Sequence, residues 1–186
     1  MNEIISESVK VLKNGGIILY PTDTIWGLGC DPTNEDAISA IYNIKQRDKS
    51  KCMLVLVDSI DMLEKYVDFV PKIAQSLIEV ADKPLTIIYP KAKNLSKSIL
   101  APDGSIGIRI PKNDFCLQLI KEFGKPLIST SANKAGKKPP FGYFDIDNEI
   151  KISVDYIVPL HLEELSIAKS SEIIRLDKNG NITVIR

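Results

Sequence analysis

The chain has 186 residues, the length of one ordinary domain, and its 44% hydrophobic residues are enough to bury a core. The 24 basic residues cancel the 24 acidic ones, so no net positive field exists to hold nucleic acid non-specifically. A local basic patch is compatible with these numbers, so an RNA partner is disfavoured rather than excluded. We expect a single domain over residues 1–186.

The cysteine and histidine content argues against a disulfide framework, a zinc site and a histidine-dependent triad. The cysteines, Cys30, Cys52 and Cys116, are odd in number and distant in sequence, which favours reduced thiols. His161 is the only histidine, and there is no Cys-x-x-Cys pair. The N-terminus lacks a signal-peptide pattern, and no apolar run approaches the roughly 20 residues that span a bilayer. We expect a cytoplasmic protein with no membrane partner.

Helical and strand patterns alternate along the chain. Ile5, Val9 and Leu12 lie on one face of a predicted helix that Gly15 stops. The apolar run at 17–20 predicts a buried strand. Later predicted elements are a helix capped by Thr33 or Asn34, a polar helix end at 45–51, a strand at 53–57, a short helix from Ser59 to residue 66, a helix after Pro71, strands at 85–89 and 105–110, a helix ended by Gly124, and a strand at 127–129.

This alternation of strands and helices is typical of the α/β class. Residues 133–144 are rich in Lys, Gly and Pro and predict a long loop. The Asn-Gly pair at 179–180 predicts a hairpin between two short terminal strands. Because the crossovers vary in length and the chain ends in a hairpin, we expect a mixed sheet flanked by helices rather than a fully parallel one.

The first candidate ligand site is residues 21–29, which follow the first buried strand as a loop. Ligands in open α/β sheets usually bind at strand ends. Asp23 and Thr24 place a carboxylate and a hydroxyl there, and Gly27 and Gly29 would let the backbone approach a ligand closely. A plain polar turn with a half-buried tryptophan explains the same residues equally well.

Two further polar segments are candidates for phosphate contacts. Lys45 and Arg47 can reach one ligand only where the helix unwinds, because positions i and i+2 do not share a helical face. A solvated helix end is the plainer alternative. Residues 129–133, Ser-Thr-Ser-Ala-Asn, run off the fifth predicted strand and suit phosphate contacts, although turns and caps use the same residue types.

Arg109 lies inside an apolar predicted strand, where a buried cation usually has an anionic partner. A bound carboxylate and a structural Asp or Glu explain it equally well. Ser171 precedes a strand near the C-terminus, where capping is the plainer explanation. The sequence has no P-loop and no strand-associated G-x-G-x-x-G, so nucleotide binding would need another arrangement.

The order of these blocks resembles the YrdC-like family, which contains the threonylcarbamoyl-AMP synthases of tRNA modification. The resemblance implies a twisted α/β sheet with a large concave cavity. It also implies an enzyme that makes threonylcarbamoyl-adenylate and pyrophosphate from L-threonine, bicarbonate or CO2, and ATP, with Mg2+ on the phosphates. The blocks that carry it are Pro-Thr-Asp-Thr at 21–24, Lys-x-Arg at 45–47, Pro-Leu-Thr at 84–86, Ser-Ile-Gly-Ile-Arg at 105–109 and the segment at 129–133.

The resemblance further implies a role for each candidate residue, with no protein side chain as a metal ligand. The threonine-binding residues would be Thr24, Arg109, Ser129 and Ser171. The ATP-binding residues would be Arg47, Lys51, Ser105, Ser131 and Arg186. The catalytic set would be Lys45, Arg47, Ser131 and Asn133.

The implied product would pass to a partner transferase that modifies tRNA. The competing hypothesis is a non-catalytic RNA-binding or ribosome-associated module, motivated by the lysines around 45–51 and 134–138. A third hypothesis is related carbamoyl-adenylate chemistry on another acceptor amino acid.

Overall fold

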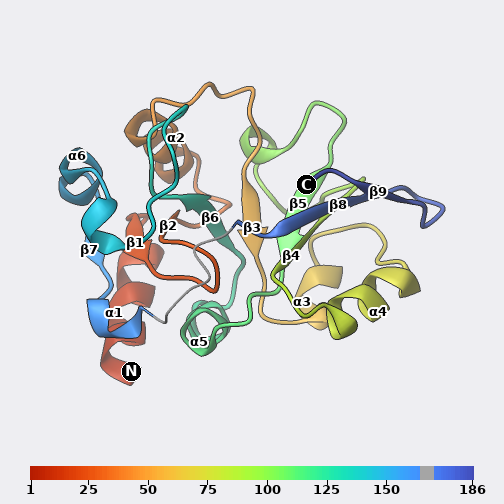
Figure 1. The fold of residues 1–186 in the computed structure, drawn as a ribbon, viewed down its shortest axis with the longest axis horizontal. Coiled ribbons are helices and arrows are strands. Elements are labelled where there is room, and N and C mark those ends of the chain that lie inside the picture. Colours follow the sequence, from red (N-terminus) through yellow and green to blue (C-terminus); the bar gives the residue numbers. More distant parts are fainter. Residues whose placement is uncertain (164–169) are drawn as a thin grey trace.

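The computed structural model describes residues 1–163 and 170–186, and these residues form a nine-stranded sheet (Figure 1). The strands are β1 (Ile18–Tyr20), β2 (Gly27–Gly29), β3 (Leu54–Leu56), β4 (Leu85–Tyr89), β5 (Ile106–Arg109), β6 (Leu127–Ser131), β7 (Tyr156–Ile157), β8 (Glu172–Leu176) and β9 (Ile182–Val184). Their order across the sheet is β7-β1-β2-β6-β3-β5-β4-β8-β9.

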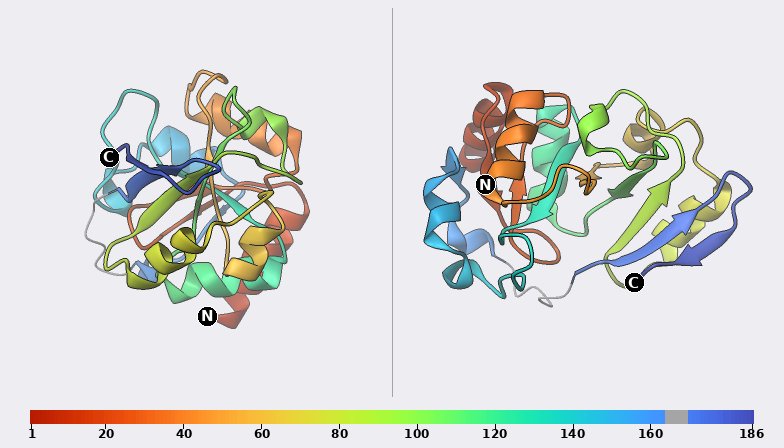
Figure 2. Two further views of the ribbon diagram at one scale, coloured as in Figure 1. Left: turned by 90° about the vertical axis from the view of Figure 1, so that its right-hand side faces the viewer. Right: turned by 90° about the horizontal axis from the view of Figure 1, so that it is seen from above.

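The sheet is mixed, as the sequence predicts. The pairs β1–β7, β3–β5 and β4–β8 are parallel, and the other five neighbouring pairs are antiparallel. The terminal hairpin of β8 and β9 is also confirmed, with Arg175 opposite Thr183. The two views of Figure 2 show the sheet twisting along its length, as the handedness of strands requires.

Helices flank both halves of the sheet. In Figure 1, α1, α2, α5 and α6 surround the half that contains β1, β2 and β6, whereas α3 and α4 lie beside β4 and β8. None of the helices in the described part of the chain has the length and apolar character to cross a bilayer. Their bounds are α1 (Asn2–Lys13), α2 (Glu35–Ile44), α3 (Ile60–Glu64), α4 (Lys72–Val80), α5 (Asp114–Phe123) and α6 (Asn148–Ile152), with short 3-10 helices at Lys97–Ile99, Tyr143–Asp145 and Leu160–Leu162.

Local capping chemistry fixes several helix ends where the sequence predicts them. The side chains of Asn34 and Ser59 accept hydrogen bonds from the backbone N–H groups of Ala37 and Met62, three residues into each helix. Gly124 ends α5 with φ of 75°, a left-handed conformation that glycine adopts without steric cost.

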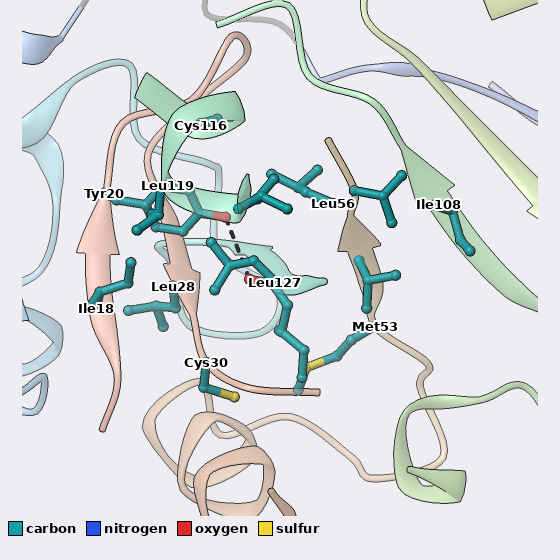
Figure 3. Packing of buried hydrophobic residues seen from close by; sticks show 14 of the residues in the cluster. Ile18, Tyr20, Leu28, Cys30, Met53, Leu56, Ile108, Cys116, Leu119 and Leu127 are labelled. Atoms are coloured by element: carbon teal, nitrogen blue, oxygen red, sulfur yellow. Dashed lines mark hydrogen bonds between the residues drawn. The ribbon is translucent and has the colours of Figure 1, made fainter. Parts of the chain in front are cut away.

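The predicted loop at 21–29 is partly wrong, because its last three residues form β2 between β1 and β6. The predicted role of Gly29 also changes. A Cβ atom at Gly29 would lie 2.8 Å from Cε1 of Tyr20 and 3.1 Å from the carbonyl oxygen of Ile128. Tyr20 is fully buried, and its hydroxyl donates to that same carbonyl across 3.4 Å (Figure 3). Gly29 therefore makes room for an aromatic ring of the core rather than for a ligand.

We predict that Gly29→Ala lowers the free energy of unfolding by about 1–3 kcal/mol, because the new methyl group overpacks the core against Tyr20. Urea denaturation measures this loss. The control is a double-mutant cycle with Tyr20→Leu, in which the smaller side chain should absorb much of the cost of the alanine. Strictly additive losses would contradict a direct clash between the two positions.

Candidate functional site

A cavity of about 310 Å³ opens on one face of the sheet, within the size range of small-molecule sites. Its floor follows the register of five strands, because residues opposite one another on neighbouring strands point to the same face. Ser131 and Gly27 extend the lining onto β2. The aligned floor residues are Ser129 of β6, Leu54 of β3, Gly107 of β5, Ile88 of β4 and Arg175 of β8.

Gly107 opens the middle of this floor. A Cβ atom there would lie 3.3 Å from Cγ2 of Thr86 and 3.5 Å from Cβ of Leu54, so a larger residue would fill the cavity. Two residues along β5, on the same face, Arg109 enters the cavity wall. The Ile-Gly-Ile-Arg strand therefore supplies both the space and a cation beside it.

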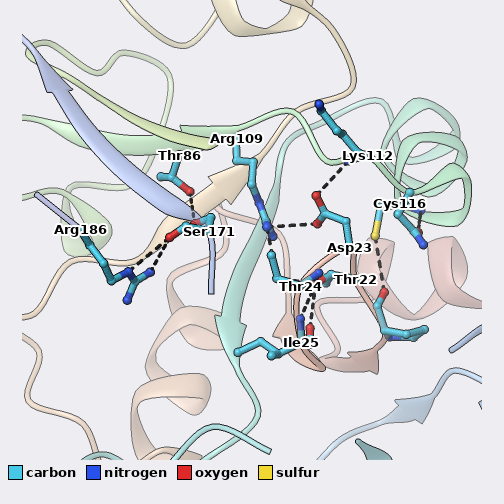
Figure 4. Close-up of polar contacts among 12 residues, drawn as sticks. Thr22, Asp23, Thr24, Ile25, Thr86, Arg109, Lys112, Cys116, Ser171 and Arg186 are labelled. Carbon is cyan, nitrogen blue, oxygen red and sulfur yellow. Dashed lines mark hydrogen bonds and ion pairs between the residues drawn. The ribbon is translucent and has the colours of Figure 1, made fainter. Parts of the chain in front are cut away.

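Arg109 and Asp23 form a buried ion pair at the cavity wall (Figure 4). Nη1 of Arg109 lies 3.1 Å from Oδ1 of Asp23, and each side chain is only 4% exposed. Oδ2 of Asp23 accepts a hydrogen bond from the backbone N–H of Lys112. Of the two partners that the sequence left open for Arg109, the structure shows the protein carboxylate.

Arg109 also holds Thr24 in place. Its Nη1 donates to the Thr24 hydroxyl across 3.2 Å, and that hydroxyl lies 2.9 Å from the hydroxyl of Thr22. Nε of Arg109 is buried and has no hydrogen-bond partner among the described residues. A buried N–H without a partner is costly, so this guanidinium retains capacity for an anionic ligand.

Ser171 joins the same wall from the start of β8. Its hydroxyl lies 2.7 Å from that of Thr86 on β4, and both residues are buried. Arg186 donates from Nε and Nη2 to the carbonyl oxygen of Ser171, which ties the end of the described chain to the cavity (Figure 4). Sequence reasoning did not single out Thr86 as a site residue, although it stands in the Pro-Leu-Thr block.

The helix α2 ends before Lys45, as the sequence analysis required if Lys45 and Arg47 were to reach one ligand. The two side chains nevertheless point to different places. Between them, Gln46 adopts a left-handed conformation with φ of 49°. Arg47 lines the cavity. Lys45 is buried, and its ammonium donates to the backbone carbonyls of Ser131 and, across 2.7 Å, of Asn133.

Lys45 therefore contacts the 131–133 segment from behind the cavity lining. The backbone carbonyl of Lys45 also accepts a hydrogen bond from the backbone N–H of Ala135. Both the side chain and the backbone of Lys45 therefore bond to the chain that follows β6. Burial, and secondarily the positive charge of Arg47, lowers the pKa of Lys45 to about 7. This lysine is placed to position the polar segment rather than to touch a molecule in the cavity.

Of the other residues predicted to contact phosphates, two line the cavity and two do not. Ser105 and Ser131 line the cavity, and Ser131 belongs to β6, which extends beyond the predicted strand end. Lys51 is exposed and lies outside the lining. Asn133 also lies outside it, with its amide nitrogen donating to the carbonyls of Lys134 and Lys137.

Arg175 is a cavity residue that sequence reasoning missed. It lies in the apolar strand β8, so the rule that drew attention to Arg109 would also have found it. Together the lining contains four arginines, and no Asp or Glu is among the described lining residues. A cavity with this charge fits a polyanion. The four are Arg47, Arg109, Arg175 and Arg186.

A metal ion held by protein side chains does not fit this donor set. The described residues contain no group of three or more His, Cys, Asp or Glu side chains that would surround a metal. Asp23 and Asp103, which contact cavity residues, are each paired with an arginine, and Glu163 accepts a hydrogen bond from Nε1 of Trp26.

Comparison with known proteins assigns the chain to a family. The sequence model of the Sua5/YciO/YrdC family, described as telomere recombination, matches residues 10–186. This chain therefore belongs to the Sua5/YciO/YrdC family. It is similar to the threonylcarbamoyl-AMP synthase of Hahella chejuensis, with 33% identity over 170 residues and 91% of each chain. It is also similar to the threonylcarbamoyl-AMP synthase of Psychromonas ingrahamii, with 41% identity over 132 residues and 69% of each chain.

Solved structures share the fold. E. coli YciO aligns with a TM-score of 0.85 and 25% identity, covering 100% of this chain and 89% of its own. P. abyssi Sua5 complexed with L-threonine aligns with a TM-score of 0.88 and 24% identity over 98% of this chain. The present chain spans 53% of that protein's length, about half. These likenesses confirm the mixed α/β fold of the family.

We predict that Asp23→Asn lowers the free energy of unfolding by about 3 kcal/mol or more, because it leaves the buried Arg109 without its counter-charge. Chemical denaturation measures the loss. Asp103→Asn is the matched control, since its pair with Arg175 is about half exposed and should be worth about 1 kcal/mol or less. Equal losses in the two variants would contradict the special role of the Asp23 pair.

We predict that the free energy of unfolding depends on pH through Lys45. Its folded pKa of about 7 lies below the ordinary 10.5, so between these values the unfolded chain binds more protons. Stability from this group therefore rises with pH, by up to about 1.4 kcal/mol per pH unit. Urea melts at several pH values should show that Lys45→Met removes this slope relative to the unsubstituted chain.

Comparing the two chains isolates Lys45, because other buried groups titrate in both. Burial raises the pKa of the Cys30 thiol and of the Tyr20 hydroxyl, and both contribute a slope of opposite sign. Lys178→Met, at an exposed hairpin position, is the control and should leave the slope unchanged. An identical slope in the Lys45→Met chain would refute the assignment.

Proposed function

We propose that this protein is an enzyme, a threonylcarbamoyl-AMP synthase, and therefore a nucleotidyltransferase. It would join L-threonine, bicarbonate or CO2, and ATP to give L-threonylcarbamoyladenylate and pyrophosphate. The observation that carries the proposal is the cavity itself, where four arginines and a set of hydroxyl groups converge with no Asp or Glu among the described lining residues. Two relatives that are named threonylcarbamoyl-AMP synthase, from Hahella chejuensis and Psychromonas ingrahamii, support it, because their similarity covers 91% and 69% of this chain.

The proposed chemistry suits a site without a histidine base. The amine of threonine attacks CO2 to give a carbamate and a proton, and a carbamate oxygen then displaces pyrophosphate from the α-phosphorus of ATP. Such a displacement depends on in-line alignment and on neutralising charge more than on a general base. Mg2+ bound to the phosphates would supply part of that neutralisation. The guanidinium groups of the cavity would supply the rest.

We assign the amino-acid side of the site to the wall around Arg109. Its guanidinium would take the carboxylate of threonine, and Thr24, Ser129 and Ser171 would hydrogen-bond the substrate. All four of these residues line the cavity. The buried Nε of Arg109 that lacks a partner supports this role.

We assign the nucleotide side to a second group of lining residues, of which Arg186 lies beside the amino-acid wall through its hydrogen bonds to the carbonyl oxygen of Ser171. Arg47, Ser105, Ser131 and Arg186 would contact ATP directly, since all four line the cavity. Lys51 would contact the nucleotide only from the exposed rim. Lys45 and Asn133 would act on the phosphates through the segment that they hold, with Lys45 bonded to the carbonyls of Ser131 and Asn133.

The product would be consumed by a transferase that modifies an adenosine of tRNA. The competing RNA-binding module is not favoured, because the arginines line a cavity beside buried hydroxyls instead of forming an open basic surface. The relatives named as synthases point the same way. An RNA module would bind RNA with a steep salt dependence and form no adenylate.

We predict that the purified chain releases pyrophosphate from ATP only when L-threonine and bicarbonate are both present, with the adenylate identified by mass spectrometry. Arg47→Met should lower the rate roughly 10²-fold, the scale of losing one charge-stabilising donor. Lys178→Met is the control and should keep the full rate. Release without threonine, release with other amino acids at the same rate, or none at all would refute the proposal.

A further inference from the structure

Arg175 lines the cavity, yet none of the roles proposed above uses it. It stands at one end of the five-strand floor row, and Ser129 stands at the other. The row crosses four strand spacings, so the two Cα atoms lie roughly 19 Å apart. Arg175 therefore adds a cation at the end of the cavity that is remote from β6.

The side chain of Arg175 is held by a neighbouring loop. Its Nη1 donates to Oδ2 of Asp103 across 2.8 Å, and its Nη2 lies 3.5 Å from the hydroxyl of Ser105. The other carboxylate oxygen of Asp103 accepts from both the hydroxyl and the backbone N–H of Ser105, at 2.6 Å and 3.0 Å. One carboxylate thus fixes two residues of the cavity lining.

This half-exposed ion pair lies at the edge of the cavity. Arg175 and Ser105 belong to the cavity lining, whereas Asp103 does not. The carboxylate therefore holds the guanidinium from outside the cavity and leaves further N–H groups of Arg175 available, since arginine carries five donors. The ion pair orients the cation toward the cavity without consuming its capacity to bind an anion.

We propose that Arg175 is a further phosphate-binding residue of this site, acting beside Ser105, and that Asp103 positions both. The inference rests on the proposed function, because it assigns the anion to the phosphates of the nucleotide. Arginine binds phosphate oxygens in a bidentate geometry, which suits an end-on contact at the cavity end.

The position of Arg175 distinguishes phosphate from the carboxylate of the amino acid. The floor row of Arg175 contains Gly107, and the amino-acid wall begins two residues further along β5, at Arg109. In β8, Ser171 of that wall lies four residues before Arg175, with Ile173 between them, in the same direction as Arg109. Ser105 lies on the other side of Gly107, away from Arg109. Arg175 and Ser105 thus share the end opposite the amino-acid wall.

The test measures binding in the absence of threonine, by calorimetry with ATP, inorganic tripolyphosphate and adenosine. Arg175→Gln should weaken the binding of ATP and of tripolyphosphate by roughly tenfold or more, the scale of one charge-assisted contact. Adenosine binding should not change. Arg175→Lys should retain part of the phosphate affinity, because it keeps the charge and loses the planar fork. Asp103→Asn should weaken phosphate binding less than Arg175→Gln does.

Lys178→Gln is the matched control, since it removes a positive charge from the same hairpin at an exposed position outside the cavity lining. Unchanged affinities in Arg175→Gln, an equal loss for adenosine, or no tripolyphosphate binding by the unsubstituted chain would overturn the proposal. Thermal unfolding checks that each variant is folded, and Arg175→Lys carries the test if the glutamine variant is not.

The binding experiment is separate from the pyrophosphate assay. A chain that binds ATP through Arg175 and releases no pyrophosphate refutes the synthase proposal alone. If the chain is an active synthase and Arg175→Gln leaves its affinity for ATP and tripolyphosphate unchanged, only the present inference is refuted.

Discussion

The buried pair of Asp23 and Arg109 is the interaction on which the site depends. It joins the loop after β1 to β5, and Thr24 of that loop is 85 residues from Arg109 in sequence. Both charged side chains of the pair are buried away from water. Two desolvated charges are tolerable only with close geometry and added hydrogen bonds. The N–H of Lys112 and the hydroxyl of Thr24 provide those bonds. Breaking the pair would free both the loop and the cation.

The alternation of side chains along the strands explains how one sheet provides both a core and a cavity. In β5, Gly107 and Arg109 line the cavity, while Ile108 is buried in the hydrophobic cluster and does not line it. The absence of a side chain at Gly107 then converts a packed face into a recess. A shift of one residue in register would put Ile108 on the cavity face and Arg109 on the core face.

Electrostatics in this protein are local rather than global. The chain has a formal net charge of zero, yet four arginines line one cavity. Asp23 and Asp103 lie outside the lining and form ion pairs with Arg109 and Arg175, respectively. Hydrogen bonds from Ser105, followed by the contact with Arg175, hold the pKa of the Asp103 carboxyl well below its usual range. The carboxylates therefore fix the cations in position while the cavity itself stays positive.

Features that depend on residues close together in the chain could be predicted from the sequence. The alternation of strand and helix patterns indicated the α/β class, and the varied crossovers and the terminal hairpin indicated the mixed sheet. Gly124 marked a helix end, either Thr33 or Asn34 was expected to cap α2, and the isolated charge of Arg109 indicated an anionic partner. Tertiary structure alone decided which partner that was. It also turned Lys45 toward two backbone carbonyls, made three residues of a predicted loop into β2, and brought Arg175 to the cavity. The physical reason is that these outcomes depend on strand order and register, which are set by contacts between segments far apart in the chain.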